Sequence, residues 1–225
     1  MADRQGKLVD LSHVIEQGMV TYKGLPGPII CDYWIREGTA SQYDDGSSFQ
    51  IARIDMVANT GTYLDTPFHR YAEGKDLAAV DLDAIAALEG IVVRVPWTER
   101  LGIEGRDLAH LDLRGKAVLL HTGWDEHWRT DAYCHDHPFL TADGARLLLQ
   151  GGARLVGIDS HNIDDTRARS RPVHSMLLGA GMLICEHMTN LGALPDTGFR
   201  FTAAAPRVAG MGTFPLRAFA QIVGD

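Results

Sequence analysis

The 225-residue sequence contains no apolar run approaching the ~20 residues that a membrane-spanning helix needs. Its first residues, MADRQGKLVDLSHVI, lack the apolar core of a secretory signal peptide, so we expect none. No cluster of lysine and arginine offsets the net charge of −8, which argues against general nucleic-acid binding. We therefore expect neither a membrane nor a nucleic acid as a partner.

Cysteine is also scarce. Cys31, Cys134 and Cys185 are far apart and form no CxxC pair, so the sequence offers no sulfur-based metal site. An odd number of isolated cysteines fits reduced thiols in a cytoplasm, where we expect the protein. Cys185 lies in the apolar run GMLIC and is predicted to be a core residue rather than a nucleophile.

The composition, with 45% hydrophobic and 22% charged residues, is ordinary for a globular protein. The chain is long enough to bury a substantial core, and no segment repeats another, so we expect one domain over residues 1–225. Patterning predicts strands over 7–12, 29–34, 49–58, 91–95, 116–121, 154–158, 181–186 and 199–205. It predicts helices over 81–88, 141–150 and 172–179, with a helical turn at 108–111. This irregular alternation indicates an α/β fold with a mixed, barrel-like sheet and flanking helices.

The segment most informative about function is residues 59–70, NTGTYLDTPFHR. Gly61 and Pro67 bend the backbone, so we expect Asp65 and His69 to lie on a constrained turn. A carboxylate and an imidazole in this setting suit a metal site or an acid/base pair. A helix N-cap aspartate near a surface histidine is the alternative, and this segment alone leaves both open.

Two later polar residues emerge from apolar surroundings. His174 lies in PVHSMLL, and Glu186 ends the predicted strand GMLICE. A buried carboxylate is costly without a partner, so Glu186 requires an arginine, a backbone amide or a cation. Asp65, His174 and Glu186 together form an oxygen–nitrogen–oxygen set suited to Zn²⁺ or Mn²⁺.

For the other aromatic and imidazole side chains, we favour structural roles over substrate binding or metal ligation. Tyr22 lies in a Gly/Pro-rich loop, where it either lines a pocket or packs locally, and we favour local packing. A second group of histidines follows no single helix face or turn, and we predict that its members are solvated or locally bonded rather than metal ligands. These histidines are His121, His127, His135 and His137.

Over nearly its whole length the chain resembles the cyclase family, which includes bacterial kynurenine formamidase and isatin hydrolase. The landmarks that carry the resemblance are, in order, DLSHVIEQGMVTY, GTYLDTPFH, HTGW, GIDSHNID, HSMLLGAGMLICE and AAPRVAGMGTFPLRAFA. The resemblance implies a swivelling β/β/α domain, usually assembled as a dimer or tetramer. We accordingly expect a homodimer or homotetramer, whose interface would cover Tyr22, Tyr33 and Trp34.

The family's central motif normally reads HxGTHxDxPxH. Its two early histidines and the aspartate bind one zinc; the aspartate, a later histidine and a glutamate bind the other, and the last motif histidine exchanges protons. Carried over, Asp65, His174 and Glu186 match the ligands of the second metal, and His69 matches the acid/base. The early histidines are replaced by Asn59 and Tyr63. Amide and phenol oxygens are poor zinc ligands at neutral pH, so we expect one divalent metal, Zn or Mn, or none.

These observations lead to one hypothesis with one alternative. The hypothesis is a metal-dependent hydrolase that cleaves a small-molecule amide, cyclic amide or ester with metal-activated water, with His69 as general acid/base. Tyr63 would donate a hydrogen bond to the developing oxyanion. Tyr22, at the position where the family places an aromatic against the substrate ring, and Asn59 would bind the substrate. The alternative is a non-catalytic small-molecule-binding member of the same fold with a dismantled metal site.

Overall fold

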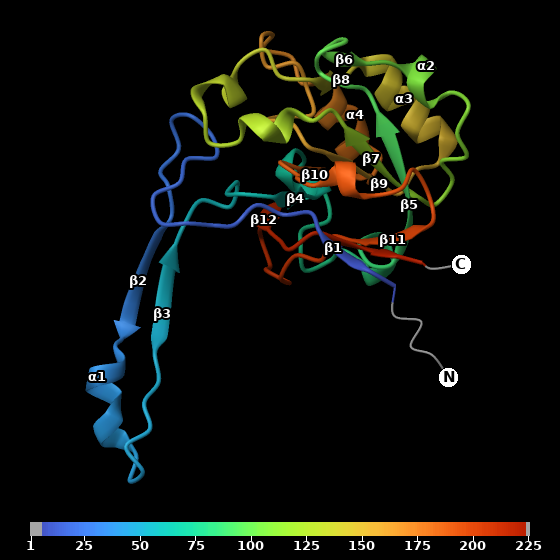
Figure 1. Cartoon of the computed structure of the whole chain (residues 1–225). Coiled ribbons are helices and arrows are strands. Elements are labelled where there is room, and N and C mark those ends of the chain that lie inside the picture. The colour runs from blue at the N-terminus through green and yellow to red at the C-terminus, as the bar shows by residue number, and fades with distance from the viewer. Residues whose placement is uncertain (1–5, 224–225) are drawn as a thin grey trace, which may run out of the picture.

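The computed structural model describes residues 6–223. Its body is built on a nine-stranded mixed sheet with the order β1-β13-β11-β5-β7-β9-β10-β4-β12 (Figure 1). The strands of this sheet are β1 (Leu8–Asp10), β4 (Tyr63–Asp65), β5 (Leu88–Arg94), β7 (Ala117–His121), β9 (Leu155–Ile158), β10 (Leu183–Glu186), β11 (Phe199–Thr202), β12 (Thr213–Pro215) and β13 (Phe219–Ile222). The predicted α/β class and mixed sheet are confirmed.

Few helices accompany the sheet. The α-helices of the body are α2 (Gly105–Leu108), α3 (Ala142–Gly151) and α4 (Pro172–Gly179). The 3₁₀ turns are η2 (Pro67–His69), η3 (Leu82–Ala84), η4 (Trp124–His127), η5 (Asp131–Cys134) and η6 (Leu191–Ala193), and β6 (Gly102–Ile103) pairs with β8 (Phe139–Leu140). Within residues 6–223, no helix has the length and apolarity required to cross a membrane.

The centre of the sheet is parallel, because β5, β7, β9 and β10 run in the same direction. Neighbouring side chains of these strands belong to different hydrophobic clusters. Leu119 packs in a cluster with Phe199, whereas Leu120 packs in a cluster with Leu148 of α3 and Leu177 of α4. Because successive side chains of a strand point to opposite faces, the sheet is buried on both faces.

Several predicted elements are found where the patterning placed them. The helix over 172–179 coincides with α4, and Pro172 occupies its first turn, where a missing N–H costs nothing. Helix α3 begins after Thr141, whose hydroxyl accepts a hydrogen bond from Gly144 N at 3.3 Å. Cys185 is fully buried, as predicted.

Two predicted elements were wrong. The helix over 81–88 is only the short turn η3, because Leu88 begins β5 and pairs with Phe201 in the sheet. Asp65 ends strand β4 instead of lying on a turn, because β4 is paired on both sides, with β10 and with β12. In both places, pairing with a distant segment overrides the local pattern.

An arm comprising residues 29–55 stands apart from the body. It contains β2 (Ile29–Trp34), α1 (Arg36–Thr39), η1 (Ala40–Gln42) and β3 (Ile51–Asp55). Strands β2 and β3 form a separate two-stranded sheet, and Figure 1 shows the arm extending away from the body. The predicted strand over 29–34 is confirmed as β2, whereas the one over 49–58 is shorter, since β3 ends at Asp55.

Candidate metal centre and active site

Asp65 lies at the centre of the candidate site. It ends β4 and pairs with Ile184 of β10 on one side and with Thr213 of β12 on the other. Its side chain is fully buried, and its Oδ2 atom has no hydrogen-bond partner. A buried carboxylate oxygen without a donor is expensive, so this position calls for a cation or a protonated group.

His174, on α4, faces this carboxylate. Its Nε2 atom lies 3.7 Å from Asp65 Oδ2 and 3.6 Å from Glu186 Oε1. Its Nδ1 atom contacts Asp164 Oδ2 at 2.7 Å, which orients the ring. Burial alone would lower the pKa of His174, but Glu186, Asp164 and Asp65 together raise it to about 10. The imidazole therefore lies in a strongly negative environment.

Glu186 ends β10 and is buried, as its position in the sequence suggested. One of the partners predicted for it, a backbone amide, is present: Ile163 N donates to Oε1 at 2.7 Å. The Tyr63 hydroxyl, which was not among the predicted partners, donates to Oε2 at 2.7 Å. Burial raises the pKa of Glu186 to about 7, against the opposing effect of the nearby His174. Each carboxylate oxygen retains a second lone pair that can still face a cation.

His69, at the end of η2, lies on the solvent side of the site with 35% of its side chain exposed. Its Nδ1 atom is 2.8 Å from Thr213 Oγ1, and the same hydroxyl contacts Asp65 Oδ1. An ionised carboxylate only accepts hydrogen bonds, so the Thr213 proton points to Asp65 and the hydroxyl must accept from His69 Nδ1–H. In the neutral imidazole this arrangement places the proton on Nδ1, so Nε2 is the nitrogen whose lone pair can act as a base.

The structure thus brings the predicted acid/base and the predicted ligands into one volume. Within residues 6–223, the group whose ligand atoms all lie within 4.8 Å of one another is Asp65, His69 and His174. The set predicted from the sequence contained Glu186 in place of His69. Glu186 reaches the site through its 3.6 Å approach to His174 Nε2, and its role as a ligand remains a prediction.

Tyr63 connects the carboxylates to a second cluster. Its hydroxyl donates to Glu186, and His187 Nε2 lies 3.3 Å from the same oxygen. Tyr133 in turn contacts His187 Nδ1 at 3.0 Å. Burial and then Glu186 raise the pKa of Tyr63 well above its usual value, so the phenol remains protonated. The oxyanion role of Tyr63 stays a prediction; in this structure its proton is directed to Glu186.

The second cluster, which we call the aromatic cluster, consists of Tyr22, Tyr133, His161 and His187. The Tyr22 ring lies 4.4 Å from that of His161 and 5.8 Å from that of His187. Burial lowers the pKa of His161 to about 3 and the pKa of His187 well below its usual value. These imidazoles are therefore neutral at physiological pH.

The two predicted substrate-binding residues lie on the segments that flank the arm. Tyr22 precedes β2, is half-buried, and its hydroxyl contacts Asn162. It is therefore not the exposed aromatic that we expected at an interface. Asn59 follows β3 and is also half-buried. Their contact with a substrate remains a prediction.

Two residues important to the geometry were missed. Asp164 accepts hydrogen bonds from the backbone of Val173 at 2.8 Å and of His174 at 3.0 Å, in addition to its contact with the His174 ring. Thr213 joins His69 to Asp65. The sequence did indicate Asp164, because this residue ends GIDSHNID, one of the segments that resemble the cyclase family. Thr213 also lies in such a segment, AAPRVAGMGTFPLRAFA, but a lone threonine carries no chemical signal, and only strand pairing brings it beside Asp65, 148 positions away.

The histidines near residue 121 play no part in this centre. His121 Nδ1 contacts Arg94 Nη1 at 2.8 Å, and His137 contacts Pro138 O at 2.9 Å and Thr166 Oγ1 at 2.8 Å. The prediction that these two are locally bonded is confirmed.

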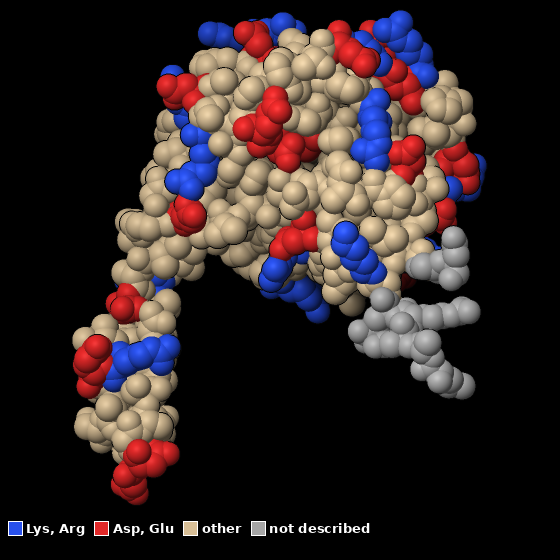
Figure 2. Space-filling model, viewed as in Figure 1, with Lys and Arg blue, Asp and Glu red and all other residues tan. Residues whose placement is uncertain are grey.

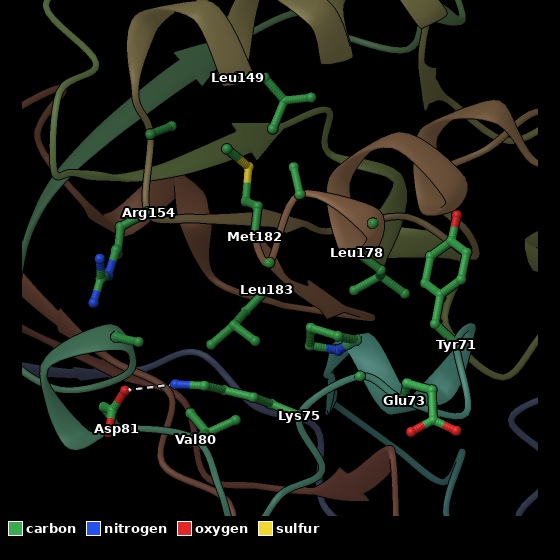
Figure 3. A pocket seen from close by; sticks show the side chains of 17 residues that line it. Tyr71, Glu73, Lys75, Val80, Asp81, Leu149, Arg154, Leu178, Met182 and Leu183 are labelled. Atoms are coloured by element: carbon green, nitrogen blue, oxygen red, sulfur yellow. Dashed lines mark hydrogen bonds and ion pairs between the residues drawn. The ribbon is translucent and has the colours of Figure 1, made fainter.

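A groove of about 1090 Å³ lies at the C-terminal end of α4 (Figure 3). Its labelled side chains include Tyr71, Leu178 and Met182, and its Lys75 is paired with Asp81 at 2.9 Å. None of the candidate site residues lines it. We therefore place the chemistry at the buried Asp65 centre, where Asp65 Oδ2 has no hydrogen-bond partner, rather than in this groove.

A buried cluster of carboxylates and imidazoles at the strand ends of a mixed sheet defines a candidate hydrolytic metal centre. Residues 9–165 match the Cyclase family, described as putative cyclase, and the chain belongs to this family. It is 28% identical over 198 residues to a kynurenine formamidase of Geobacillus thermodenitrificans, covering 83% of this chain and 88% of that protein.

Solved structures agree with this assignment. A predicted metal-dependent hydrolase from Bacillus stearothermophilus is 28% identical, with a TM-score of 0.75 over 95% of this chain and 97% of that one. Isatin hydrolase A from Labrenzia aggregata, bound to benzyl benzoate, superposes with a TM-score of 0.83 over 100% of this chain and 96% of that one. At 19% identity, the second likeness shows the fold alone, and it confirms the fold expected from the resemblance.

Proposed function

We propose that this protein is a metal-dependent hydrolase that cleaves the carbonyl–nitrogen bond of a small amide, formamide or cyclic amide. The observation that carries the proposal is the buried, unpartnered Asp65 Oδ2 atom facing His174 Nε2 at 3.7 Å. The relatives support the same class, since they are described as kynurenine formamidases and as a metal-dependent hydrolase.

The residues present fit a divalent cation. Asp65 and His174 supply an oxygen and a nitrogen that face one another, and Asp164 keeps His174 Nε2 turned toward Asp65. Glu186 would complete the set, with Zn²⁺ or Mn²⁺ as the ion. When bound, the ion would polarise the substrate carbonyl and lower the pKa of water. Because Asn59 and Tyr63 are poor ligands, we expect about one ion per chain.

His69 would act as the general base and then as the general acid. Its Nδ1–H is held by Thr213, so Nε2 can take a proton from water and return it to the leaving nitrogen. Its partial exposure gives this proton a path to solvent. Thr213 is thereby a positioning residue, since it selects the tautomer of His69 and also donates to Asp65.

The aromatic cluster would receive the body of the substrate. Its rings are neutral and its hydroxyls are protonated, because burial raises the pKa values of Tyr22 and Tyr133 and lowers those of His161 and His187. Such a surface favours an uncharged planar group over a cation or an anion. Tyr22 and Asn59, from the segments that flank the arm, would contact that group.

The test combines metal analysis with a substrate screen. Protein purified without chelator should hold about one Zn²⁺ or Mn²⁺ per chain. After chelation, activity on a panel of formamides, lactams and esters should vanish, and it should return when the ion is restored. Two tightly held ions per chain would contradict the expected stoichiometry. A protein that binds panel members without hydrolysing any of them would instead support the non-catalytic alternative.

A further inference from the structure

The groove at the C-terminal end of α4, which we call the α4 groove, has an apolar floor. Leu178, Met182 and Leu183 line it, and none of these residues is more than 5% exposed. Its volume of about 1090 Å³ can hold a small organic molecule, because ligand sites in proteins commonly measure roughly 300–1,000 Å³. An apolar group that settles on this floor would be removed from water, which favours its binding.

Charged side chains lie at the two ends of this floor. Figure 3 shows Arg154 and Asp81 at one end and Glu73, beside Tyr71, at the other. Lys75 Nζ pairs with Asp81 at 2.9 Å, whereas Arg154 forms no ion pair with any of the residues that the structure describes. The Arg154 end of the groove therefore has two positive charges and one negative charge, and it can accept one further carboxylate.

The rest of the protein does not attract anions. Its net charge is −8, and acidic and basic side chains are interspersed on the face of the body shown in Figure 2. A carboxylate is therefore held only where a local surplus of positive charge adjoins a surface for the remainder of the molecule. The Arg154 end of the α4 groove meets both conditions, because a guanidinium can bind a carboxylate through two parallel hydrogen bonds.

Elements that carry candidate site residues also reach the α4 groove. Helix α4 has His174 in its first turn and Leu178, which lines the groove, in its last turn. The turn η2 begins at Pro67, in the groove, and ends at His69. Strand β10 likewise begins in the groove and ends at Glu186. The groove and the Asp65 centre thus lie at opposite ends of the same elements.

Tyr71 joins two of these elements to each other. Its backbone N donates to Pro67 O at 2.9 Å, and its hydroxyl donates to Ser175 O, in α4, at 2.8 Å. The side chain packs on α4 so closely that a Cβ at Gly179 would lie 3.2 Å from the Tyr71 hydroxyl oxygen. Because Tyr71 also lines the groove, a ligand there would contact the side chain that holds η2 against α4.

We propose that the α4 groove binds a small organic carboxylate, with the carboxylate at Arg154 and an apolar body on the floor toward Tyr71, and that binding changes turnover at the Asp65 centre. Charge complementarity selects this occupant over a neutral molecule or an amine. Hydrolysis of an amide releases a carboxylate and an amine, so a product of the proposed reaction belongs to this chemical class. The change in turnover rests on the proposed function, whereas the binding does not.

The first test uses molecules that share one body and differ in charge: 4-phenylbutyrate, 4-phenylbutan-1-ol and 4-phenylbutylamine. In titration calorimetry on protein purified without chelator, the carboxylate should bind at least ~10-fold tighter than the alcohol, because it gains hydrogen bonds between charged groups. The amine should bind no tighter than the alcohol. A carboxylate that does not bind, or that binds no tighter than the alcohol or the amine, would overturn the proposal.

The variant Arg154→Gln should lose this preference for the carboxylate. Arg200→Gln is the matched control, because Arg200 is also exposed, forms no ion pair within residues 6–223 and lies on β11 outside the groove. It should bind the carboxylate like the parent. A preference that survives in Arg154→Gln would place the carboxylate elsewhere, such as at the metal centre, and would overturn the groove as its site.

Sedimentation of the same variants tests a different occupant, a second copy of the chain. Both variants should sediment with the mass of the parent. If Arg154→Gln lowers the mass of the assembly and Arg200→Gln does not, a protein surface covers the groove and the site for a small carboxylate is wrong.

The change in turnover is tested through Tyr71. At saturating substrate, where competition at the centre is suppressed, 4-phenylbutyrate should change kcat of the parent at least ~2-fold and leave that of Arg154→Gln unchanged. Tyr71→Phe keeps the ring but loses the hydrogen bond to Ser175, so it should bind the carboxylate like the parent and show a smaller change in kcat.

The outcomes separate the two parts of the proposal. An unchanged kcat in the parent, or equal changes in the parent and in Tyr71→Phe, would contradict the coupling between the groove and the centre while leaving the binding supported. Selective carboxylate binding by a protein that hydrolyses no member of the substrate panel would support the groove as a site and contradict the proposed function.

Discussion

The two halves of the site contain the same residue type in opposite states. His174, among the carboxylates, has its pKa raised to about 10, whereas His161, among aromatic rings and other histidines, has its pKa lowered to about 3. Both side chains are buried, so burial alone does not decide the direction. At His174 the carboxylates of Glu186 and Asp164 override burial and raise the pKa. At His161, whose ring lies 5.3 Å from that of His137, burial itself lowers the pKa and His137 lowers it further.

Because the charges of the two halves differ, each half suits a different kind of ligand. The carboxylate half concentrates negative charge and suits a cation, while the aromatic cluster is neutral and suits an uncharged ring. Tyr63 lies at the boundary, since it donates to Glu186 and its oxygen is 3.3 Å from His187 Nε2. The position at which the family normally has an early histidine thus holds a phenol that joins the two halves. This arrangement is consistent with one metal site rather than two.

The largest effect should follow from neutralising the charged half. Asp65→Asn removes a charged ligand from a fully buried position and should lower both metal content and turnover. The loss of turnover should at least equal the ~10²–10⁴-fold expected for a general acid/base. Elemental analysis and initial rates would measure both. An Asp65→Asn protein that keeps its metal and its rate would remove Asp65 from the site.

His69→Ala sharpens the assignment within the same half. If His69 is the acid/base, turnover should fall ~10²–10⁴-fold while metal content and melting temperature stay near those of the parent. If His69 is instead a ligand, as its place within 4.8 Å of Asp65 and His174 allows, metal content should fall as well. Metal analysis beside the rate measurement decides between the two roles.

Tyr63→Phe removes the hydroxyl that joins the two halves of the site. The variant leaves Glu186 Oε2 without its buried donor, and the loss of a hydrogen bond to a charged group costs about 1.5–3 kcal/mol. Urea unfolding at pH 7.5 should show a decrease of this size in the free energy of unfolding. Tyr43→Phe is the control, because Tyr43 is 52% exposed on the arm and should change stability little. Equal stabilities of the two variants would contradict the boundary role.

Much of the core fold could be predicted because its signals are local. The segments of β7, β9 and α4 show a continuous apolar run or a capping pattern, and the structure places each where the pattern did. What could not be predicted depends on pairing between distant segments. Residues 63–65 become a strand only because β10 and β12 flank them, and the helix expected over 81–88 gives way to the pairing of Leu88 with Phe201.

The candidate site residues divide in the same way, into those with a local sequence signal and those that depend on pairing between distant segments. Asp65, His69, His174 and Glu186 could be predicted because each stands in a motif that resembles those of a known family. Thr213 could not, because a threonine near the end of the chain carries no chemical signal until β12 places it against Asp65. The exposure of the arm could not be predicted from the sequence either. The alternation of residues 49–58 predicts a strand but not its surroundings, and every residue of β3 is exposed within one chain.

The smallest predicted effect tests the neutral half through its response to acid. The pKa of His161 is about 3 in the folded protein, against 6.5 for an ordinary histidine, so below pH 6.5 the unfolded chain binds a proton that the folded chain does not. His161 therefore destabilises the fold as the pH falls from 6.5 toward 3, by about 1.4 kcal/mol per pH unit, or about 2 kcal/mol at pH 5. Glu186 and Asp159, whose pKa values are raised to about 7, have the opposite slope between their ordinary values and pH 7. Their contributions cancel when a variant is compared with the parent.

His161→Phe should keep the ring and remove the titration. Its Nδ1 atom is buried without a partner, so the substitution sacrifices no hydrogen bond at that atom. Near pH 7.5 the variant and the parent should unfold at similar urea concentrations, whereas at pH 5 the variant should be more stable by up to about 2 kcal/mol. His110→Phe, at an exposed position, should show no such difference between the two pH values. His174 does not contribute to this window, because its pKa is raised and the stability that it confers is fully present below pH 6.5. A variant that loses stability in acid as steeply as the parent would show that His161 is not held neutral and that the two halves are less different than the structure indicates.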